Sequence, residues 1–371
     1  MGEKVLVTGG AGFIGRAVCR ELIERGNEVR VLDNLIEQVH GDCQRPADLP
    51  ADVELIRGDI RNKDVVTRSL KGIDSIINLA AEVGVGQSMY AVERYTSVNE
   101  VGGAVLFEAL IEQPVRRVVT ASSMSIYGEG LYRDPDGELV QNAERKPRTS
   151  ETDSWDPTDA QGRVLSPVAT PEWKQPSLAS IYALGKYVQE RQTLIMTQAY
   201  GMEGACLRLF NVYGPGQALS NPYTGVLAIF SSRLTNGQRP MIFEDGEQRR
   251  DFVYVGDVAR AFAEALVRPE ANGEVFNIGS GQDRSVSDVA RSIARAMGKN
   301  TVEPEIVGKS RIGDIRHCFC DGSKAAEKLG FLAEKDFHEG LSELSAWVAA
   351  QTADDRVDQA RAELEARGLV A

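Results

Sequence analysis

The stretch TGGAGFIG, residues 8–15, decides the fold of this chain. It follows an apolar run at residues 4–7, which indicates a short buried strand of a parallel sheet. Three of its four glycines, Gly9, Gly12 and Gly15, are spaced three apart. In such a turn the first glycine allows the tight bend, the second lets the backbone approach a pyrophosphate, and the third lets the next helix pack closely. The free N–H groups at the start of that helix would then face the phosphates of a dinucleotide.

The acid at the end of the second strand indicates which dinucleotide is bound. Residues 28–32 form a second apolar run, and Asp33 follows directly. A carboxylate there would accept hydrogen bonds from the hydroxyls of the adenosine ribose. No arginine follows Asp33, so a 2′-phosphate would meet an unpaired negative charge, which favours NAD over NADP. The alternative is that Asp33 and Asn34 are only a turn-forming pair.

Bulk composition indicates a globular protein with a large core. The 371 residues allow one large domain or two modest ones, and the hydrophobic and charged fractions, 42% and 26%, are ordinary. A net charge of −12 argues against nucleic acid or an anionic membrane surface as the main partner. No apolar run approaches the ~18 residues of a membrane span. We expect no signal peptide, because the glycine turn begins at residue 8.

The cysteines suggest a reducing compartment. There are five, an odd number, and they are scattered, which favours a cytoplasmic protein over a disulfide framework. Cys318 and Cys320 lie close to His317, but their alternation is typical of one face of a strand. We therefore expect no metal site.

Strands and helices alternate up to about residue 125, which predicts right-handed crossovers and a parallel sheet covered on both faces. We expect an α/β protein: a Rossmann doubly wound sheet over residues 1–210, a smaller α/β substrate-binding region over 211–350 with some segments interleaved with the first domain, and a C-terminal surface helix over 351–371. Residues 129–178 lack apolar periodicity and are predicted to be a long inserted loop near the ligand pocket, although their charged side chains could equally form a solvated flap. The expected strands are 53–57, 75–79, 117–121, 204–210 and 274–278, and the expected helices are 12–25, 63–71, 92–111, 180–200, 226–236, 258–267, 286–297, 323–329, 337–349 and 354–367.

Tyr182 and Lys186 are the candidate proton-transfer pair. Their i, i+4 spacing places both side chains on one face of a predicted helix. A phenol titrates near pH ~10 in water, and a nearby ammonium together with a positive nicotinamide ring would lower its pKa. Ser123, just beyond a strand, could share the proton of a substrate hydroxyl. The alternatives are a chance surface pair and, for Ser123, a cap on the next segment.

The ordered motifs of the chain resemble those of the extended short-chain dehydrogenases/reductases, in the NAD-dependent nucleotide-sugar epimerase/dehydratase group. The resemblance covers roughly residues 1–350. The motifs that carry it are TGGAGFIG at 8–15, VLDNL at 31–35, GDI at 58–60, NLAA at 78–81, SSMSIYG at 122–128, YALGK at 182–186, FNVYGPG at 210–216 and RDFVYVGDV at 250–258.

The resemblance implies a role for each matching residue. The catalytic set would be Ser123, Tyr182 and Lys186. A nucleotide-diphosphate sugar would be held by Ser123, Asn211, Val226, Arg250 and Arg311, although Arg250 could instead form a surface ion pair with Asp251. A homodimer would form through helices at 101–110 and 182–197. The cofactor would contact Gly9, Gly12, Phe13, Ile14, Gly15, Asp33, Asn34, Asp59, Ile60, Leu79, Ala80, Ala81, Asn99, Tyr182 and Lys186.

Departures from the family pattern narrow the reaction. Family 4,6-dehydratases carry an Asp-Glu pair where this chain has Met124 and Ser125, so elimination of water is not expected. Reductases that consume NADPH would not place an acid at Asp33. Of the reactions in this family, this leaves a redox-neutral inversion at C4 of a nucleotide sugar. Asn78 stands where many relatives have histidine, which bears on cofactor packing.

The sugar is indicated only by a few segments. Residues 221–226, 313–317 and the insertion look most like the branch of dTDP-L-rhamnose 4-epimerases, which interconvert dTDP-L-rhamnose and dTDP-6-deoxy-L-talose. UDP-glucose or UDP-glucuronate 4-epimerisation and UDP-uronate decarboxylation are the alternatives. A net oxidoreductase, or a cofactor-sensing regulator without catalysis, are the alternatives from other classes.

Overall fold

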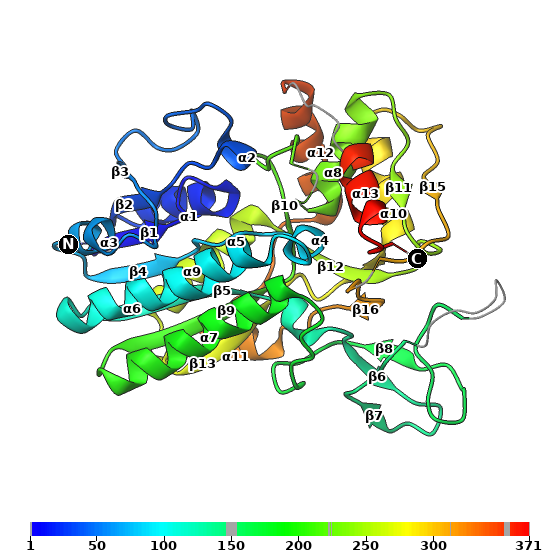
Figure 1. Ribbon diagram of the computed structural model, residues 1–371, viewed down its shortest axis with the longest axis horizontal. Helices are drawn as coiled ribbons and strands as arrows, with labels where there is room; N and C mark the ends of the chain where they lie inside the picture. Colours follow the sequence, from blue (N-terminus) through cyan, green and yellow to red (C-terminus); the bar gives the residue numbers. More distant parts are fainter. Residues whose placement is uncertain are drawn as a thin grey trace.

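The computed structural model describes residues 2–145, 154–221, 223, 225–311, 313–351 and 357–370. A seven-stranded sheet forms the centre of the first region, in the order β13-β9-β5-β4-β1-β2-β3 (Figure 1). All of its pairings are parallel. Its strands are β1 (Lys4–Thr8), β2 (Glu28–Asp33), β3 (Glu54–Arg57), β4 (Ser75–Asn78), β5 (Arg117–Ser123), β9 (Glu203–Leu209) and β13 (Glu274–Ile278).

The strand order reverses between β1 and β4, and ligands of open α/β sheets bind at such a switch point. The register brings the strand ends together: Thr8 of β1 lies opposite Leu32 of β2 and Asn78 of β4. The glycine turn, Asp33 and the segment after Asn78 therefore meet at one edge of the sheet. The predicted doubly wound fold is confirmed.

Helices cover both faces of the sheet because successive side chains of its buried strands, which point to opposite faces, are apolar. Val5 and Val7 of β1 belong to a core shared with α1 (Phe13–Glu24), α9 (Val255–Val267) and α11 (Ser323–Leu329). Leu6 points to the other face, where α3 (Lys63–Ser69) and α6 (Gly102–Glu112) pack. The helix α7 (Ile181–Ala199) lies beside α6 on this second face (Figure 1).

The second region lies beyond the carboxyl edge of the sheet (Figure 1). Its core joins α8 (Val226–Thr235), α10 (Val286–Ala296) and α12 (Phe337–Ala349). The boundary at 210 stays a prediction, since β13 and α9 return from the later sequence to the main sheet. The remaining strands of this region are β10 (Asn211–Tyr213), β11 (Met241–Ile242), β12 (Arg249–Tyr254), β14 (Asp283–Ser285), β15 (Glu305–Ile306) and β16 (His317–Cys318).

The insertion departs from the predicted loop. Its described residues form a three-stranded antiparallel sheet of β6 (Leu131–Arg133), β7 (Leu139–Val140) and β8 (Ser166–Val168). Tyr132 and Leu165 form a small apolar core there. Periodicity missed these strands because they are only two or three residues long. Residues 146–153 of the predicted loop lie outside the described residues.

Two helices also differ from the prediction. The helix expected at 92–111 is divided into α5 (Val92–Thr96), a π-helical turn (Ser97–Val101) and α6. The terminal helix is α13 (Val357–Ala366), and residues 354–356 of its predicted span lie outside the described part. The short helices α2 (Glu37–His40) and α4 (Val85–Ser88) and the 3-10 turns Met124–Tyr127 and Pro269–Ala271 complete the fold.

Candidate active site

A cavity of about 830 Å³ opens at the carboxyl edge of the seven-stranded sheet. This volume falls in the range of cofactor and ligand clefts, about 300–1,000 Å³. Its wall includes nearly all of the residues predicted to contact the cofactor: Gly9, Gly12, Phe13, Ile14, Gly15, Asp33, Asn34, Asp59, Ile60, Leu79, Ala80, Ala81, Tyr182 and Lys186.

The glycine turn has the geometry that a dinucleotide requires. Gly9 has φ +68°, and a Cβ there would lie 2.9 Å from the nitrogen of Ala80. A Cβ at Gly15 would lie 2.5 Å from Cα of Gly10, so only glycine lets α1 pack this close to the turn. No side chain caps the start of α1 at Gly12, which leaves its first N–H groups free to bind an anion at the cavity. These residues fit a dinucleotide diphosphate.

Asp33 combines both of the roles considered for it. One carboxylate oxygen accepts from the N–H of Ala11 at 3.0 Å, and the other accepts from the N–H of Leu35 at 2.9 Å, as in an Asx turn. The side chain still lines the cavity. His40 lies 3.7 Å from Asp33, and burial lowers the pKa of that imidazole. A carboxylate has spare lone pairs, so Asp33 can hold the turn and accept from a ribose hydroxyl.

The proposed catalytic side chains meet where β5 ends beside α7. Ser180 caps α7 by accepting from the N–H of Ala183, 3.1 Å away, so the helix begins at Ile181, one residue before Tyr182. The Tyr182 phenol has a hydrogen bond from the Ser123 hydroxyl. Burial raises the pKa of Tyr182, and this hydrogen bond opposes the rise. The pKa shift in the protein alone is therefore opposite to the predicted lowering, because enclosure of the phenol dominates.

Lys186 is fully enclosed on the same helix face. Its Nζ donates to the carbonyl of Ala121 at 2.9 Å and to Oε1 of Gln189 at 3.0 Å. Burial lowers the pKa of this ammonium to about 8. An ammonium has three N–H donors, and Lys186 also lines the cavity, so one donor remains for a ligand.

Ser123 also caps the 3-10 turn Met124–Tyr127, which was the alternative role considered for it. Its Oγ accepts from the N–H of Ser125 at 3.2 Å, and the hydroxyls of the two serines are 2.8 Å apart, with Ser125 donating. Both lone pairs of Ser123 are thus used, which leaves its own proton for Tyr182. Sequence reasoning dismissed Ser125 as an acid or base and missed this orienting contact.

Asn99 does not line the cavity. It is fully buried behind the wall, where its side chain accepts from the N–H of Glu82 at 2.7 Å and donates to the Glu82 carbonyl at 3.1 Å. The prediction that Asn99 contacts the cofactor is therefore not met: it holds the loop after β4 instead.

Further wall residues were missed by sequence reasoning. Arg16 donates to the carbonyl of Ala11 at 2.7 Å and to that of Gly216 at 2.6 Å, which joins the glycine turn to the later sequence. Trp347 and Gln351, at the end of α12, also line the cavity. None of these belongs to a short motif, so no signal in the sequence could have found them.

The predicted substrate residues divide into two groups. Asn211 and Val226 line the cavity, whereas Arg250 and Arg311 do not. Of the 221–226 segment, Pro222 and Thr224 lie outside the described residues. Arg250 donates to the backbone carbonyl of Arg316 at 2.8 Å and to that of Arg249 at 2.9 Å. The alternative ion pair of Arg250 with Asp251 is wrong, because that carboxylate accepts from Ser280 and Gly281.

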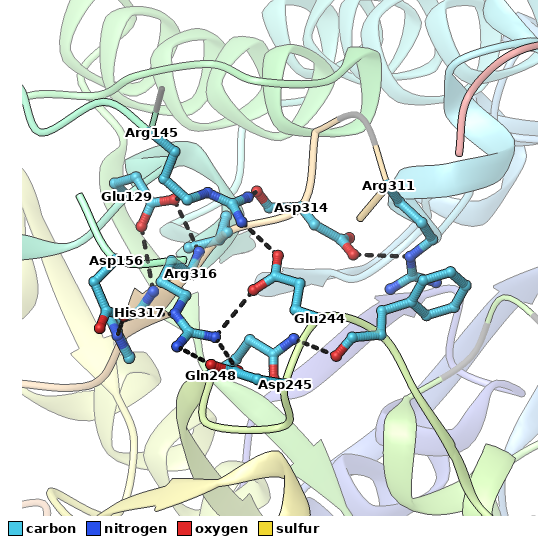
Figure 2. Close-up of polar contacts among 12 residues, drawn as sticks. Glu129, Arg145, Asp156, Glu244, Asp245, Gln248, Arg311, Asp314, Arg316 and His317 are labelled. Atoms are coloured by element: carbon cyan, nitrogen blue, oxygen red, sulfur yellow. Dashed lines mark hydrogen bonds and ion pairs between the residues drawn. The ribbon is translucent and has the colours of Figure 1, made fainter. Parts of the chain in front are cut away.

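Arg311 is already engaged as well. Its Nε donates to Asp314 at 2.8 Å, and its guanidinium lies 4.5 Å from the ring centre of Phe243 (Figure 2). Val370, from the C-terminal end of the chain, forms an antiparallel bridge with Arg311. The structure therefore does not bring the two arginines to the cavity.

An ion cluster around the buried Arg316 side chain joins the insertion to this arginine-bearing segment (Figure 2). Arg316 bonds Asp245 at 2.6 Å and Asp156 at 2.7 Å, and Glu244 lies 3.1 Å away. His317 accepts from the N–H of Arg249 through Nδ1, so its Nε2 donates to Asp156. None of the insertion's residues in the spans 129–145 and 154–178 lines the cavity, and residues 146–153 lie outside the described part, so the placement of the insertion near the ligand pocket stays a prediction.

Over the described spans, no three His, Cys, Asp or Glu side chains are grouped as a metal would need. In the same spans no helix has the length and apolar character to traverse a lipid bilayer.

Comparison with known proteins places the chain in a family. The model of the NAD dependent epimerase/dehydratase family matches residues 5–150 and 166–279. The chain is 37% identical to dTDP-L-rhamnose 4-epimerase of Burkholderia thailandensis, over 94% of this chain and 96% of that protein.

Solved structures agree with this placement. The UDP-glucose 4-epimerase of Thermotoga maritima with UDP-glucose superposes with a TM-score of 0.75 at 30% identity, over 93% of this chain and 98% of that one. The UDP-glucose 4-epimerase of Thermus thermophilus in complex with NAD gives a TM-score of 0.73 at 30% identity, over 94% and 100%. The predicted enzyme class and NAD cofactor are confirmed, and the chain belongs to the NAD-dependent epimerase/dehydratase family.

Proposed function

We propose that this protein inverts the configuration at C4 of a nucleotide-diphosphate sugar. The observation that carries the proposal is the contact between Tyr182 and Ser123, with Lys186 beside them on the wall of the dinucleotide cavity. This set can move a proton at a sugar hydroxyl. No acid pair accompanies it, since Met124 packs in an apolar cluster and Ser125 bonds Ser123.

The chain's own groups would carry the proton. Bound NAD supplies a hydride acceptor for C4 and returns the same hydride. With the positive nicotinamide ring beside it, Tyr182 would act as the phenolate and accept the proton of the O4 hydroxyl as the C4–H bond breaks, and Ser123 would turn its own proton from Tyr182 to the same oxygen. The flat 4-keto sugar then turns within the cavity. Tyr182 gives the proton back as the hydride rejoins the opposite face of C4, so protons and electrons balance and NAD ends unchanged.

We propose dTDP-L-rhamnose and dTDP-6-deoxy-L-talose as the sugar pair. The 37% identity to a dTDP-L-rhamnose 4-epimerase over nearly the whole chain supports this substrate. UDP-glucose or UDP-glucuronate 4-epimerisation and UDP-uronate decarboxylation remain the alternative outcomes of the test.

For the sugar we propose contacts from Ser123, Asn211 and Val226, which already line the cavity. Arg250 and Arg311 remain proposals for the diphosphate, because an acidic protein needs specific cations to hold a dianion. That role requires Arg311 to exchange Asp314 for phosphate and Arg250 to leave its carbonyl partners.

We propose that two copies pair through α6 and α7. These helices lie side by side on one face of the sheet (Figure 1). Ile195 of α7 is 54% exposed, and Val101, just before α6, is 50% exposed. Ile195→Lys should convert a dimer to a monomer in light scattering, and a wild-type monomer would refute the pairing.

We propose that the protein is cytoplasmic, because its cysteines are free thiols. All five cysteines are free, and four of them are buried. Cell fractionation of the source organism tests it, and recovery outside the cytoplasm would overturn it.

A panel of dTDP-, UDP- and GDP-sugars, followed by NMR, tests the reaction. We expect inversion at C4 of a dTDP-sugar with no accumulating NADH. Stoichiometric NADH would make the protein a net oxidoreductase, and loss of CO₂ from a uronate would make it a decarboxylase. Bound NAD without conversion of any sugar would favour a cofactor-sensing regulator.

A further inference from the structure

Gln189 joins two parts of the site that no short motif connects. Its Oε1 accepts from Nζ of Lys186 at 3.0 Å, and its Nε2 donates to the carbonyl of Ala80 at 3.0 Å. The side chain is buried, 2% exposed, one turn after Lys186 on α7. Ala80 lies in the loop after β4 that lines the cofactor cavity.

Only an amide satisfies both of these partners. The ammonium of Lys186 has donors and no acceptor, whereas the carbonyl of Ala80 has an acceptor and no donor. A glutamate at 189 would bond the ammonium but face the Ala80 carbonyl without a proton. A methionine would fill a similar volume and bond neither, which would leave buried polar groups without partners.

The bridge also fixes the direction of the ammonium. The ammonium donates one N–H to the backbone carbonyl of Ala121 on β5 and a second to the side-chain amide oxygen of Gln189 on α7. The third donor is then the one available to the cavity that Lys186 lines.

We propose that Gln189 is a positioning residue, which holds the Lys186 ammonium charged and aimed at the cofactor and ties it to the loop at Ala80. The proposal deepens the proposed function and rests on it for its kinetic consequence. Gln189 acts through Lys186 and contacts neither cofactor nor sugar.

Among the described residues, no carboxylate is paired with Lys186. Tyr182 precedes it on α7, and Cys206 faces it from β9, where burial keeps the thiol neutral by raising its pKa. Beyond Cys206, Glu190 is paired with Arg208 at 2.8 Å. Burial lowers the pKa of Lys186 to about 8, and the hydrogen bond that its ammonium donates to the Gln189 amide oxygen favours the charged form against that burial.

The sign of the effect follows from the acceptor. Removing Oε1 disfavours the charged amine, so Gln189→Met should lower the pKa of Lys186 by about 1 unit. Gln189→Glu places a carboxylate on the ammonium and should raise that pKa instead. A merely structural role for Gln189 would shift the pKa of Lys186 in the same direction in both variants, or not at all.

The test is a ¹³C NMR titration of the Lys186 ε-carbon in the NAD-loaded protein. The signal is identified by its loss in Lys186→Arg. Gln192→Met is the matched control, since Gln192 lies on the same helix and bonds only the carbonyl of Glu100, at 3.1 Å. We expect opposite shifts in the two Gln189 variants and none in the control.

Equal pKa values in all variants, or shifts of one sign in both, would overturn the proposal. If Gln189→Met fails to fold, an unshifted or lowered pKa in Gln189→Glu overturns it alone. The alkaline limb of kcat should follow the same shifts, with kcat of Gln189→Met about tenfold lower. Correct pKa shifts in a protein that converts no sugar would refute the proposed function and leave the positioning role intact.

Discussion

The cofactor wall of the cavity differs from the arginine wall, formed by Arg250 and Arg311, which lie outside the cavity lining. At the sheet edge, the glycine turn, Asp33 and Lys186 are fixed by backbone geometry or burial and still have polar atoms free for a ligand. In the arginine wall, Arg250 donates to backbone carbonyls and Arg311 donates to Asp314. The cofactor wall is therefore preformed, whereas binding of a diphosphate by the arginine wall requires an exchange of partners.

The largest effect is expected at the preformed wall. Tyr182→Phe should lower kcat by about 10³-fold, within the range of positioned acid–base groups, because the phenolic oxygen that carries the proton is lost. NAD should stay bound, since the glycine turn is untouched. Rapid-quench turnover and the cofactor content of the purified variant measure both. Near-normal turnover would remove Tyr182 as the base.

The second prediction concerns Asp33 on the same wall. Asp33→Ala removes a carboxylate that would bond the ribose, so NAD affinity should fall by about tenfold or more, and the preference for NAD over NADP should shrink. Calorimetric titration with both dinucleotides measures this. Asp33→Asn keeps the Asx turn with Leu35 and serves as the control. An unchanged preference in Asp33→Ala would make Asp33 a turn residue only.

The arginine wall should respond more weakly. Arg311→Gln should raise KM for the nucleotide sugar about tenfold with kcat little changed, through the loss of a charge-assisted contact to phosphate. Asp314→Asn, which frees Arg311 from its present partner, should lower KM instead. If neither variant alters KM, Arg311 has a structural role only and does not bind the nucleotide sugar.

The smallest expected effect tests the cluster behind that wall. Hydrogen bonding to His317 and then Arg316 lowers the pKa of Asp156 to about 2, against burial that would raise it. The folded pKa is below the unfolded value of about 3.9, so the stabilisation exists above pH ~4 and is lost as pH falls toward 2. Asp156→Asn should cost about 1 kcal/mol at pH 7, since the carboxylate is a third exposed. Urea unfolding measures the difference in unfolding free energy between the wild type and Asp156→Asn. A difference that does not shrink as the pH falls toward 2 would contradict this account.

Predictability from the sequence follows the same division. The glycine turn, Asp33 and the Tyr182–Lys186 pair act through local backbone geometry and helical spacing, so short motifs were enough to place them. Arg250 and Arg311 have partners both nearby and far away in the chain: Arg311 bonds the neighbouring Asp314 but also packs on Phe243, and Arg250 bonds the carbonyl of Arg316. Spacing shows that Asp314 is within reach of Arg311, but not that the two side chains pair instead of binding a ligand.

Other departures have the same cause. The insertion looked structureless because β6, β7 and β8 are too short to show a period, and their pairing is with each other. Asn99 has the right residue type near the loop after β4, yet its amide is used by the backbone of Glu82. The role of Gln189 was not predicted because it depends on a hydrogen bond to Ala80, which is distant in the sequence.

The fate of the hydrogen on C4 tests the central claim most directly. The protein is incubated with dTDP-L-rhamnose deuterated at C4, and the product is read by NMR. The account predicts dTDP-6-deoxy-L-talose that keeps its deuterium at C4, because the hydride returns to the carbon it left. Product with hydrogen from water at C4, or a keto sugar formed with one equivalent of NADH, would contradict it.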